Sequence, residues 1–425
     1  MNGYKPRIAD TQLKKMLRRI GAVLIQGPKW CGKTTTAEQI AASTIYLDDP
    51  EKEKMYRQTA ELNISALLQG DTPRLMDEWQ MLPQLWDAVR YEVDHRKSEG
   101  LFILTGSAVP PLSDEIHHTG TGRFARLTMR TMSLFESADS SGSVSLRWLF
   151  ENSDEQPQGI ANIDLNQLAF LICRGGWPNS VGKDNEDALA LAFDYYGAVV
   201  ESDISRVDGI RRNTELARRL TRSLARHQGA QVSLETIRKD MASNDESTLG
   251  ESSFAQYMNA LKSIFVVDDL PAWNPNLRSK TAIRTADTRY FNDSSIAAAA
   301  LGVAPSDLTQ DLNTMGLLFE TMAVRDLRVY AEALDGKVYH YRDKSGLECD
   351  AVIHLRNGNY GLVEIKLGGN TLIDDGVKTL NTLAERLDTT KMKEPSFKMV
   401  LTGVGEFPFR RSDGVYVVPI GCLGI

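Results

Sequence analysis

The chain has 425 residues, enough for about three domains at roughly 150 residues each. Hydrophobic residues make up 42% and charged residues 25%, which is ordinary globular usage and excludes collagen-like and low-complexity classes. The formal net charge is −7, so the chain as a whole is not a basic coat for nucleic acid. A single domain can still carry a basic face, because net charge does not report how charges are distributed.

Cysteine spacing and apolar run lengths exclude two further classes. The four cysteines have no close pair, which argues against a disulfide framework and a Cys-based zinc site. Residues 1–5 form no apolar signal core, and the longest apolar run, residues 296–304, is far shorter than the roughly 20 residues of a membrane span. We therefore expect a cytoplasmic protein with no membrane partner.

The N-terminal third predicts an α/β domain over residues 1–137. Short apolar runs at 22–25, 44–47 and 101–104 have the composition of buried strands, and helical periodicity separates them. Strands that alternate with helices favour a parallel sheet covered on both faces.

The middle of the chain is expected to be largely helical. Residues 138–204 form a connecting and helical segment that begins rich in Ser, Gly and acidic residues. Residues 205–300 show a helix, a short helix, a helix and a turn, with Ser233 and then Ser252 or Ser253 as expected helix caps. This order is typical of a winged helix-turn-helix domain.

Residues 301–425 predict a second α/β domain. It begins with a helix, continues with three strand-like runs, and ends with a further helix and strand. Asn357-Gly358 is a strong hairpin signal between the second and third of these strands.

A phosphate-binding loop follows the first strand. The pattern G-x-x-x-x-G-K-[ST] lies between an apolar strand and a helix, which is the context that this motif requires. Backbone N–H groups of such a loop wrap the phosphates, Lys33 reaches the β- and γ-phosphates, and the Thr34 hydroxyl binds Mg²⁺. The predicted ATP contacts from this loop are Gly27, Pro28, Lys29, Trp30, Cys31, Gly32, Lys33, Thr34 and Thr35.

Two acids end the next predicted strand, as in a Walker B element. We expect Asp77 to hold Mg²⁺ and Glu78 to orient or deprotonate the attacking water. Thr105 and Ser107 close the following strand, where polar side chains either sense the γ-phosphate or form a turn. Arg123 is a candidate arginine finger that contacts nucleotide.

A second set of charged residues lies near the C-terminus. The alternation in Glu364-x-Lys366 puts both side chains on one sheet face, and the hairpin brings Asp350 beside them. Carboxylates and a lysine that converge in this way can hold Mg²⁺ and activate water on a phosphodiester, with Glu320 on the preceding helix as a third carboxylate. A solvated strand face is the alternative.

These residues together resemble a known family. The phosphate loop, residues 75–80, 104–108, 122–123 and 133–136 are similar to prokaryotic AAA-type P-loop ATPases that carry a C-terminal domain of unknown function. Segments at 318–320, 341–343, 350–353 and 363–366 resemble the C-terminal half of that family, which is similar to the PD-(D/E)XK nuclease fold. Gly175-Gly176-Trp177-Pro178 fits the family's middle region. The chain departs from the family pattern at residues 288–293, where Thr-Arg-Tyr-Phe-Asn-Asp replaces a Lys before an aromatic pair and Asp.

The resemblance implies a three-part architecture: an AAA-type parallel-sheet domain, a winged-helix-like middle and a restriction-endonuclease-like α/β C-terminal domain. It also implies an ATPase site at Lys33, Thr34, Asp77 and Glu78, and a nuclease-like site at Glu320, Asp350, Glu364 and Lys366. The implied cofactors are ATP with Mg²⁺, and Mg²⁺ or Mn²⁺ at the C-terminal site.

The leading hypothesis is an ATPase coupled to a nuclease-like domain that acts on nucleic acid, DNA in preference to RNA. The first alternative is a nucleotide-controlled switch or scaffold for a protein partner, with a non-catalytic C-terminal domain. The second is a transcriptional regulator that uses the winged helix alone. An arginine finger supplied by a neighbouring subunit would make the protein a homo-oligomer, and arginines between residues 206 and 226 form either a solvated helix face or a phosphate contact.

Overall fold

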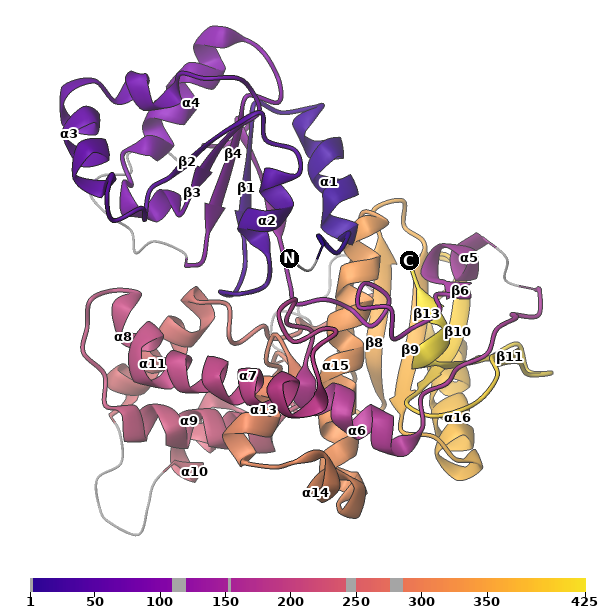
Figure 1. Cartoon of the computed structure of the whole chain (residues 1–425). Coiled ribbons are helices and arrows are strands. Elements are labelled where there is room, and N and C mark those ends of the chain that lie inside the picture. The colour runs from indigo at the N-terminus through magenta and orange to yellow at the C-terminus, as the bar shows by residue number, and fades with distance from the viewer. Residues whose placement is uncertain (1–2, 109–119, 152–153, 242–249, 276–285) are drawn as a thin grey trace. The chain divides into compact units, whose positions relative to one another are not determined.

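The computed structural model describes residues 3–108, 120–151, 154–241, 250–275 and 286–425 (Figure 1). By compactness the chain divides into two units. The first comprises Met1–Thr131, Glu201–Arg212 and Met258–Phe265, and the second comprises Met132–Val200, Asn213–Tyr257 and Val266–Ile425. The first break lies close to the expected domain boundary at residue 137, and the division into four domains stays a prediction.

The first unit contains a five-stranded, fully parallel sheet, as the alternation of strands and helices predicted. Its strand order is β2-β3-β4-β1-β5. The strands are β1 (Ala22–Gln26), β2 (Ser43–Tyr46), β3 (Arg74–Asp77), β4 (Phe102–Gly106) and β5 (Phe124–Thr128).

Helices cover both faces of this sheet (Figure 1). Because side chains alternate along a strand, Leu24 packs with Trp86 on one face, while Val23 and Ile25 pack with Leu13 on the other. The helical elements are α1 (Ile8–Leu17), α2 (Lys33–Glu38), α3 (Glu53–Asn63), η1 (Ile64–Leu68), η2 (Trp79–Met81), α4 (Leu85–Arg96) and α8 (Ile204–Arg206), with a π-helical turn η3 (Val199–Asp203) before α8.

The helical part of the second unit begins after a short strand, β6 (Val144–Ser145). Ser233 caps α10 as predicted, since its hydroxyl accepts the backbone N–H of Thr236 at 3.0 Å. The prediction for the next helix is wrong, because α11 begins at Glu251 and both Ser252 and Ser253 lie inside its first turn. The helices are α5 (Leu146–Glu151), α6 (Leu165–Arg174), α7 (Asn185–Ala198), α9 (Thr214–Arg226), α10 (Leu234–Asp240), α11 (Glu251–Ser263), α13 (Ser294–Leu301), α14 (Pro305–Gln310) and α15 (Leu312–Ala333).

After α11, the chain pairs with itself through two isolated antiparallel bridges, Val267 with Phe291 and Leu270 with Thr288. The predicted order of helix, short helix and helix is therefore present, followed by this paired segment. The winged-helix fold itself stays a prediction.

A six-stranded sheet of order β11-β12-β10-β9-β8-β7 forms the C-terminal part. Strands β7 to β9 are an antiparallel meander, whereas β9, β10 and β12 run parallel. The predicted hairpin at Asn357-Gly358 joins β8 to β9, and Gly358 has a φ of 83°, which favours glycine. The elements are β7 (Gly336–Arg342), β8 (Glu348–Leu355), β9 (Tyr360–Lys366), α16 (Asn370–Arg386), β10 (Phe397–Thr402), β11 (Phe409–Arg410), β12 (Tyr416–Pro419), η4 (Ile420–Cys422) and β13 (Leu423–Gly424), the last paired with β6.

A buried ionic network holds the helical and α/β parts of the second unit together. Arg325 of α15 contacts Asp293 at 2.9 Å and Asp326 at 2.8 Å, and the three side chains are at most 1% exposed. Asp293 also accepts the backbone N–H of Gly176, and Asp326 that of Leu134, both at 2.9 Å. One arginine therefore fixes segments that lie far apart in the sequence.

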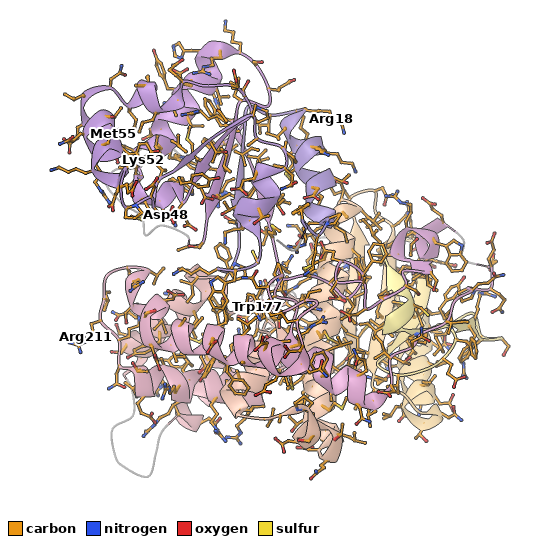
Figure 2. The ribbon with its side chains drawn as sticks, in the orientation of Figure 1. Arg18, Asp48, Lys52, Met55, Trp177 and Arg211 are labelled. Atoms are coloured by element: carbon orange, nitrogen blue, oxygen red, sulfur yellow. The ribbon has the colours of Figure 1, made fainter. Side chains whose placement is uncertain are left out.

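The Gly-Gly-Trp segment is shaped by this network. A Cβ atom on Gly175, whose φ is 70°, would lie 2.3 Å from Asp293 Oδ1, and one on Gly176 would lie 2.1 Å from the Met132 carbonyl oxygen. Trp177, labelled in Figure 2, is 1% exposed and donates its indole N–H to Ser295 at 2.9 Å. The segment is therefore a packing element of the second unit.

None of the helices in the described part of the chain has the length and apolarity needed to cross a bilayer.

We expect Arg325→Leu to lower the free energy of unfolding of the second unit by about 3–5 kcal/mol, because it leaves two buried carboxylates without their cation. Chemical denaturation followed by circular dichroism measures this loss. Arg356→Leu is the matched control, since Arg356 is 75% exposed and should change stability by less than about 0.5 kcal/mol. Equal stability of the two variants would contradict the role assigned to Arg325.

Candidate functional site

The phosphate loop lies between β1 and α2, where the sequence placed it. Its backbone has positive φ at Gly27 (158°), Trp30 (64°) and Gly32 (97°). A Cβ atom on Gly27 would lie 2.0 Å from the Met129 carbonyl oxygen, so glycine is required there by the close approach of β5's end. The loop is therefore preformed by close backbone packing.

The cationic and hydroxyl groups of the loop point to the same region. Buried Lys33 donates from Nζ to the Pro28 carbonyl oxygen at 2.8 Å, across the loop that would hold phosphates. Thr34 Oγ1 donates to Asp77 Oδ1 at 2.7 Å. The other loop side chains are placed as follows: Lys29 pairs with Asp203, Trp30 is 45% exposed, Cys31 is buried, and Thr35 is exposed.

The end of β3 completes this site. Asp77 accepts hydrogen bonds from Thr34 and from Thr105 Oγ1, the latter at 2.5 Å, and burial raises the pKa of its carboxyl above the ordinary value. Glu78 follows in a left-handed conformation (φ 53°) and accepts a hydrogen bond from Ser107 Oγ at 3.1 Å. The structure thus brings together Lys33, Thr34, Asp77, Glu78, Thr105 and Ser107.

Arg123 does not join this cluster within the first unit. It precedes β5, whose first residue, Phe124, pairs with Ala22, whereas the phosphate loop begins after Gln26 at the other end of β1. Arg123 instead contacts Asp94 at 2.8 Å. The predicted contact between Arg123 and nucleotide on the same chain therefore has no geometric support, and only a contact with a neighbouring subunit stays a prediction.

Two residues of this site were not predicted from the sequence. Arg7 is buried and donates to the Cys31 carbonyl oxygen at 2.7 Å and to the Arg130 carbonyl oxygen at 2.9 Å, which fixes the loop backbone. Gln80 donates from Nε2 to Glu78 Oε2. The Arg7 contacts are long-range, so no local motif marks them.

The C-terminal residues also converge as predicted. Lys366 Nζ lies 2.7 Å from Glu364 Oε2 and 3.1 Å from Asp350 Oδ2. Asp350 Oδ2 accepts the backbone N–H of Ile365 at 2.7 Å, which fixes the carboxylate against β9. The antiparallel register of β8 and β9 produces this contact.

Burial and neighbouring charges shift the pKa values of the acids and the base in this cluster. Glu364 is 4% exposed, and burial, followed by the charge of Asp350, raises the pKa of its carboxyl to about 8. Burial alone would lower the pKa of Lys366, but Asp350 and Glu364 raise it above the ordinary value. The ammonium of Lys366 is therefore the cation that pairs with both acids.

Glu320 is held from outside the C-terminal domain. The hydroxyl of buried Tyr290 donates to Glu320 Oε1 at 2.5 Å, and a Cβ atom on Gly229 (φ 70°) would lie 2.8 Å from the same oxygen. Burial and then Asp350 raise the pKa of Glu320 to about 8, while the Tyr290 hydrogen bond opposes the rise. Tyr290 belongs to the segment 288–293 that departs from the family pattern, so its contact with the site was missed.

The described residues contain no group of three or more His, Cys, Asp or Glu side chains arranged to hold one metal ion. Glu320, Asp350 and Glu364 are therefore not a preformed three-carboxylate centre in this structure. His340 is not a ligand either, because Gln231 and the Ala286 carbonyl oxygen occupy its ring nitrogens and burial lowers its pKa to about 4.

Three family models match parts of the chain. Residues 20–138 match an AAA domain, residues 165–307 a domain of unknown function (DUF8612), and residues 315–423 another domain of unknown function (DUF4143). Uncharacterized proteins of Mycobacterium tuberculosis and Mycobacterium bovis are each 23% identical over 417 residues, covering 97% of this chain and 83% of theirs. The Walker-type ATPase PABY2304 of Pyrococcus abyssi is 12% identical with a TM-score of 0.42, covering 70% of this chain and 96% of that one, a likeness from which no activity follows.

The AAA match covers the phosphate loop, both acids of β3 and the end of β4. Residues 20–138 are therefore a P-loop ATPase domain of the AAA type, and ATP is the ligand that this family binds.

We expect Lys33→Ala to reduce ATP hydrolysis by at least about 100-fold, because it removes the charge that contacts the transferred phosphoryl group. Phosphate release measured with Mg²⁺–ATP tests this. Lys52→Ala, an exposed lysine of the same unit (Figure 2), should retain wild-type turnover. Normal ATP turnover in Lys33→Ala would contradict the assignment of the loop as the ATP-binding site.

Proposed function

We propose that this chain is a Mg²⁺-dependent ATPase whose nucleotide state controls a nuclease-like site acting on nucleic acid, DNA in preference to RNA. The observation that carries the nuclease part is the Lys366 ammonium held between Asp350 and Glu364. A lysine between two carboxylates, on paired strands next to a Glu-bearing helix, provides a cation position and a general acid or base in one place.

The ATPase part is supported by the residues around Asp77. Thr34 and Asp77 supply hard oxygen donors 2.7 Å apart, a donor set that fits Mg²⁺. When bound, Mg²⁺ neutralises charge on the β- and γ-phosphate oxygens. Lys33 donates to the Pro28 carbonyl oxygen in this structure. With ATP bound, its ammonium would donate to a phosphate oxygen instead. Glu78 would accept a proton from the attacking water.

The C-terminal site fits a divalent cation through two carboxylates. Asp350 and Glu364 already share one cation, the Lys366 ammonium, which is a stand-in for the metal. Mg²⁺ commonly takes only one or two protein carboxylates together with substrate phosphates, and Mn²⁺ accepts the same oxygens. Bound there, the metal would polarise a phosphodiester, while a displaced Lys366 would remain close enough to hold charge against the phosphate.

Nucleic acid is favoured as the partner by exposed arginines on α9. One face of α9 is buried, whereas Arg218, Arg219, Arg222 and Arg226 are exposed on the other. Such a row suits phosphate backbones, although Glu215 pairs with Arg219 and Asp240 with Arg226. An Arg123 contribution to a neighbouring subunit would make the active form a homo-oligomer.

The alternative function, a nucleotide-controlled switch for a protein partner, has one observation in its favour. Lys366 already forms ion pairs with the two acids, and the described residues form no three-ligand group. A buried ion pair of this kind also serves as a purely structural element.

Cleavage assays separate the two functions. We expect Mg²⁺- or Mn²⁺-dependent cleavage of linear or circular DNA by the wild type, dependent on ATP, and its loss by at least about 100-fold in Asp350→Ala and Lys366→Ala. RNA substrates run in parallel test the preference for DNA. Lys337→Ala, an exposed lysine on β7 of the same sheet, is the matched control and should cleave normally.

The opposite result would favour the switch. No cleavage of either nucleic acid under any nucleotide condition, with the ATPase activity intact, would overturn the nuclease part alone. Cleavage that persists in Lys366→Ala would assign it to a contaminant or another site.

A further inference from the structure

The backbone at Glu78 is unusual. Glu78 lies between β3 and η2 with φ 53° and ψ 48°, a left-handed conformation that a side chain with a Cβ atom rarely adopts. Such conformations persist where neighbouring groups hold them, and they cluster at functional sites. The neighbours that hold the Glu78 side chain are therefore informative.

Two donors converge on one oxygen of Glu78. Gln80 donates from Nε2 to Glu78 Oε2, and Ser107 donates from Oγ to the same oxygen at 3.1 Å. The backbone N–H of Glu78 is in turn bonded to Thr105 Oγ1 at 3.2 Å. With Oε2 satisfied twice, Oε1 is the oxygen left to receive a proton.

The other half of the Gln80 amide is left without a hydrogen bond. Its carbonyl oxygen, Oε1, is buried and has no hydrogen-bond partner in the described part of the chain, and the neighbouring Trp79 Nε1 has none either. A buried amide left half satisfied is unfavourable for folding. A buried polar group that lacks a hydrogen bond, with no compensating contact nearby, is expected mainly at a functional site.

Gly106 keeps the space around this amide open. A Cβ atom at Gly106 would lie 3.1 Å from Gln80 Oε1 and 3.0 Å from Trp79 Nε1. A side chain at the end of β4 would thus press on the residues that hold Glu78. Gln80, Gly106 and Ser107 form one arrangement around the acid.

We propose that Gln80 is a positioning residue of the ATPase site: it fixes Glu78 Oε2, together with Ser107, so that Oε1 faces the attacking water. Gln80 itself touches neither nucleotide nor water in this role and acts only through Glu78. The inference rests on the proposed ATPase function and adds a residue to that site.

The test uses the full chain with Gln80→Met, which keeps the side-chain length and removes the donor. A general base contributes about 100- to 10,000-fold to a rate, and losing its orientation should remove part of that factor. We expect kcat for ATP hydrolysis to fall about 10- to 100-fold, while KM and the dissociation constant of ATP measured by calorimetry change less than twofold. Gln39→Met is the matched control, because Gln39 is exposed and donates only to the Thr35 carbonyl oxygen.

A double-mutant cycle tests whether Gln80 acts through Glu78. In a Glu78→Gln background, measured by single-turnover hydrolysis of labelled ATP so that slow rates are still resolved, Gln80→Met should change the rate less than twofold. An equal loss in both backgrounds, a parallel loss of ATP binding, or a kcat within twofold of wild type would overturn the inference. A wild-type chain that binds ATP without hydrolysing it would overturn the proposed ATPase function as well, so the two failures are distinguishable.

Discussion

Burying a carboxylate costs free energy that only hydrogen bonds or an opposite charge can offset, and this constraint shapes each part of the molecule. Asp293 and Asp326 are offset by the guanidinium of Arg325 and by the backbone N–H groups of Gly176 and Leu134. Glu364 is offset by the ammonium of Lys366. Asp77 is offset by two threonine hydroxyls, which supply hydrogen bonds and no positive charge.

The three acid clusters differ in the groups that hold their carboxyl groups. The Asp77 carboxyl is held by two neutral hydroxyl groups, and burial raises its pKa. In the C-terminal cluster the Lys366 ammonium lies 2.7 Å from Glu364. In the Arg325 network Nε and Nη2 of the guanidinium both contact Asp326 Oδ1, and Nη1 contacts Asp293 Oδ2. The three clusters therefore differ in whether hydroxyl groups, an ammonium or a guanidinium surround the acids.

Local patterns predicted the elements that depend on neighbouring residues. The phosphate loop, the end of β3 and the hairpin at Gly358 were all evident from spacing, because each is formed within a few residues. Tyr290 was missed because its contact with Glu320 spans 30 residues, and Arg7 because its contact with the loop spans 24. Gln80 lay inside the recognised segment, but nothing in its spacing from Glu78 shows that the turn through η2 brings the two side chains together.

The strand order explains why Arg123 lies away from the phosphate loop. The sequence gives no reason to expect β1 between β4 and β5, so the path of the chain back to the amino end of the sheet could not be predicted. Because parallel strands share one carboxyl edge, a residue just before a strand lies at the opposite edge from the loop that follows its neighbour. Arg123 in that position lies away from the phosphate loop of its own chain and pairs with Asp94 instead.

The segment that follows α9 contacts the helix that carries Glu320. Residues 201–212 belong to the first unit, and the chain passes directly from them into α9 of the second. The segment after α9 holds α15: Gln228 Oε1 accepts from Thr321 at 3.2 Å, and Gly229 packs against Glu320. Gln228 Oε1 also accepts the backbone N–H of Phe291, so one side chain links α15 to the residue next to Tyr290, which donates to Glu320. The surroundings of Glu320 are therefore set by residues of the helical region as well as by its own helix, α15.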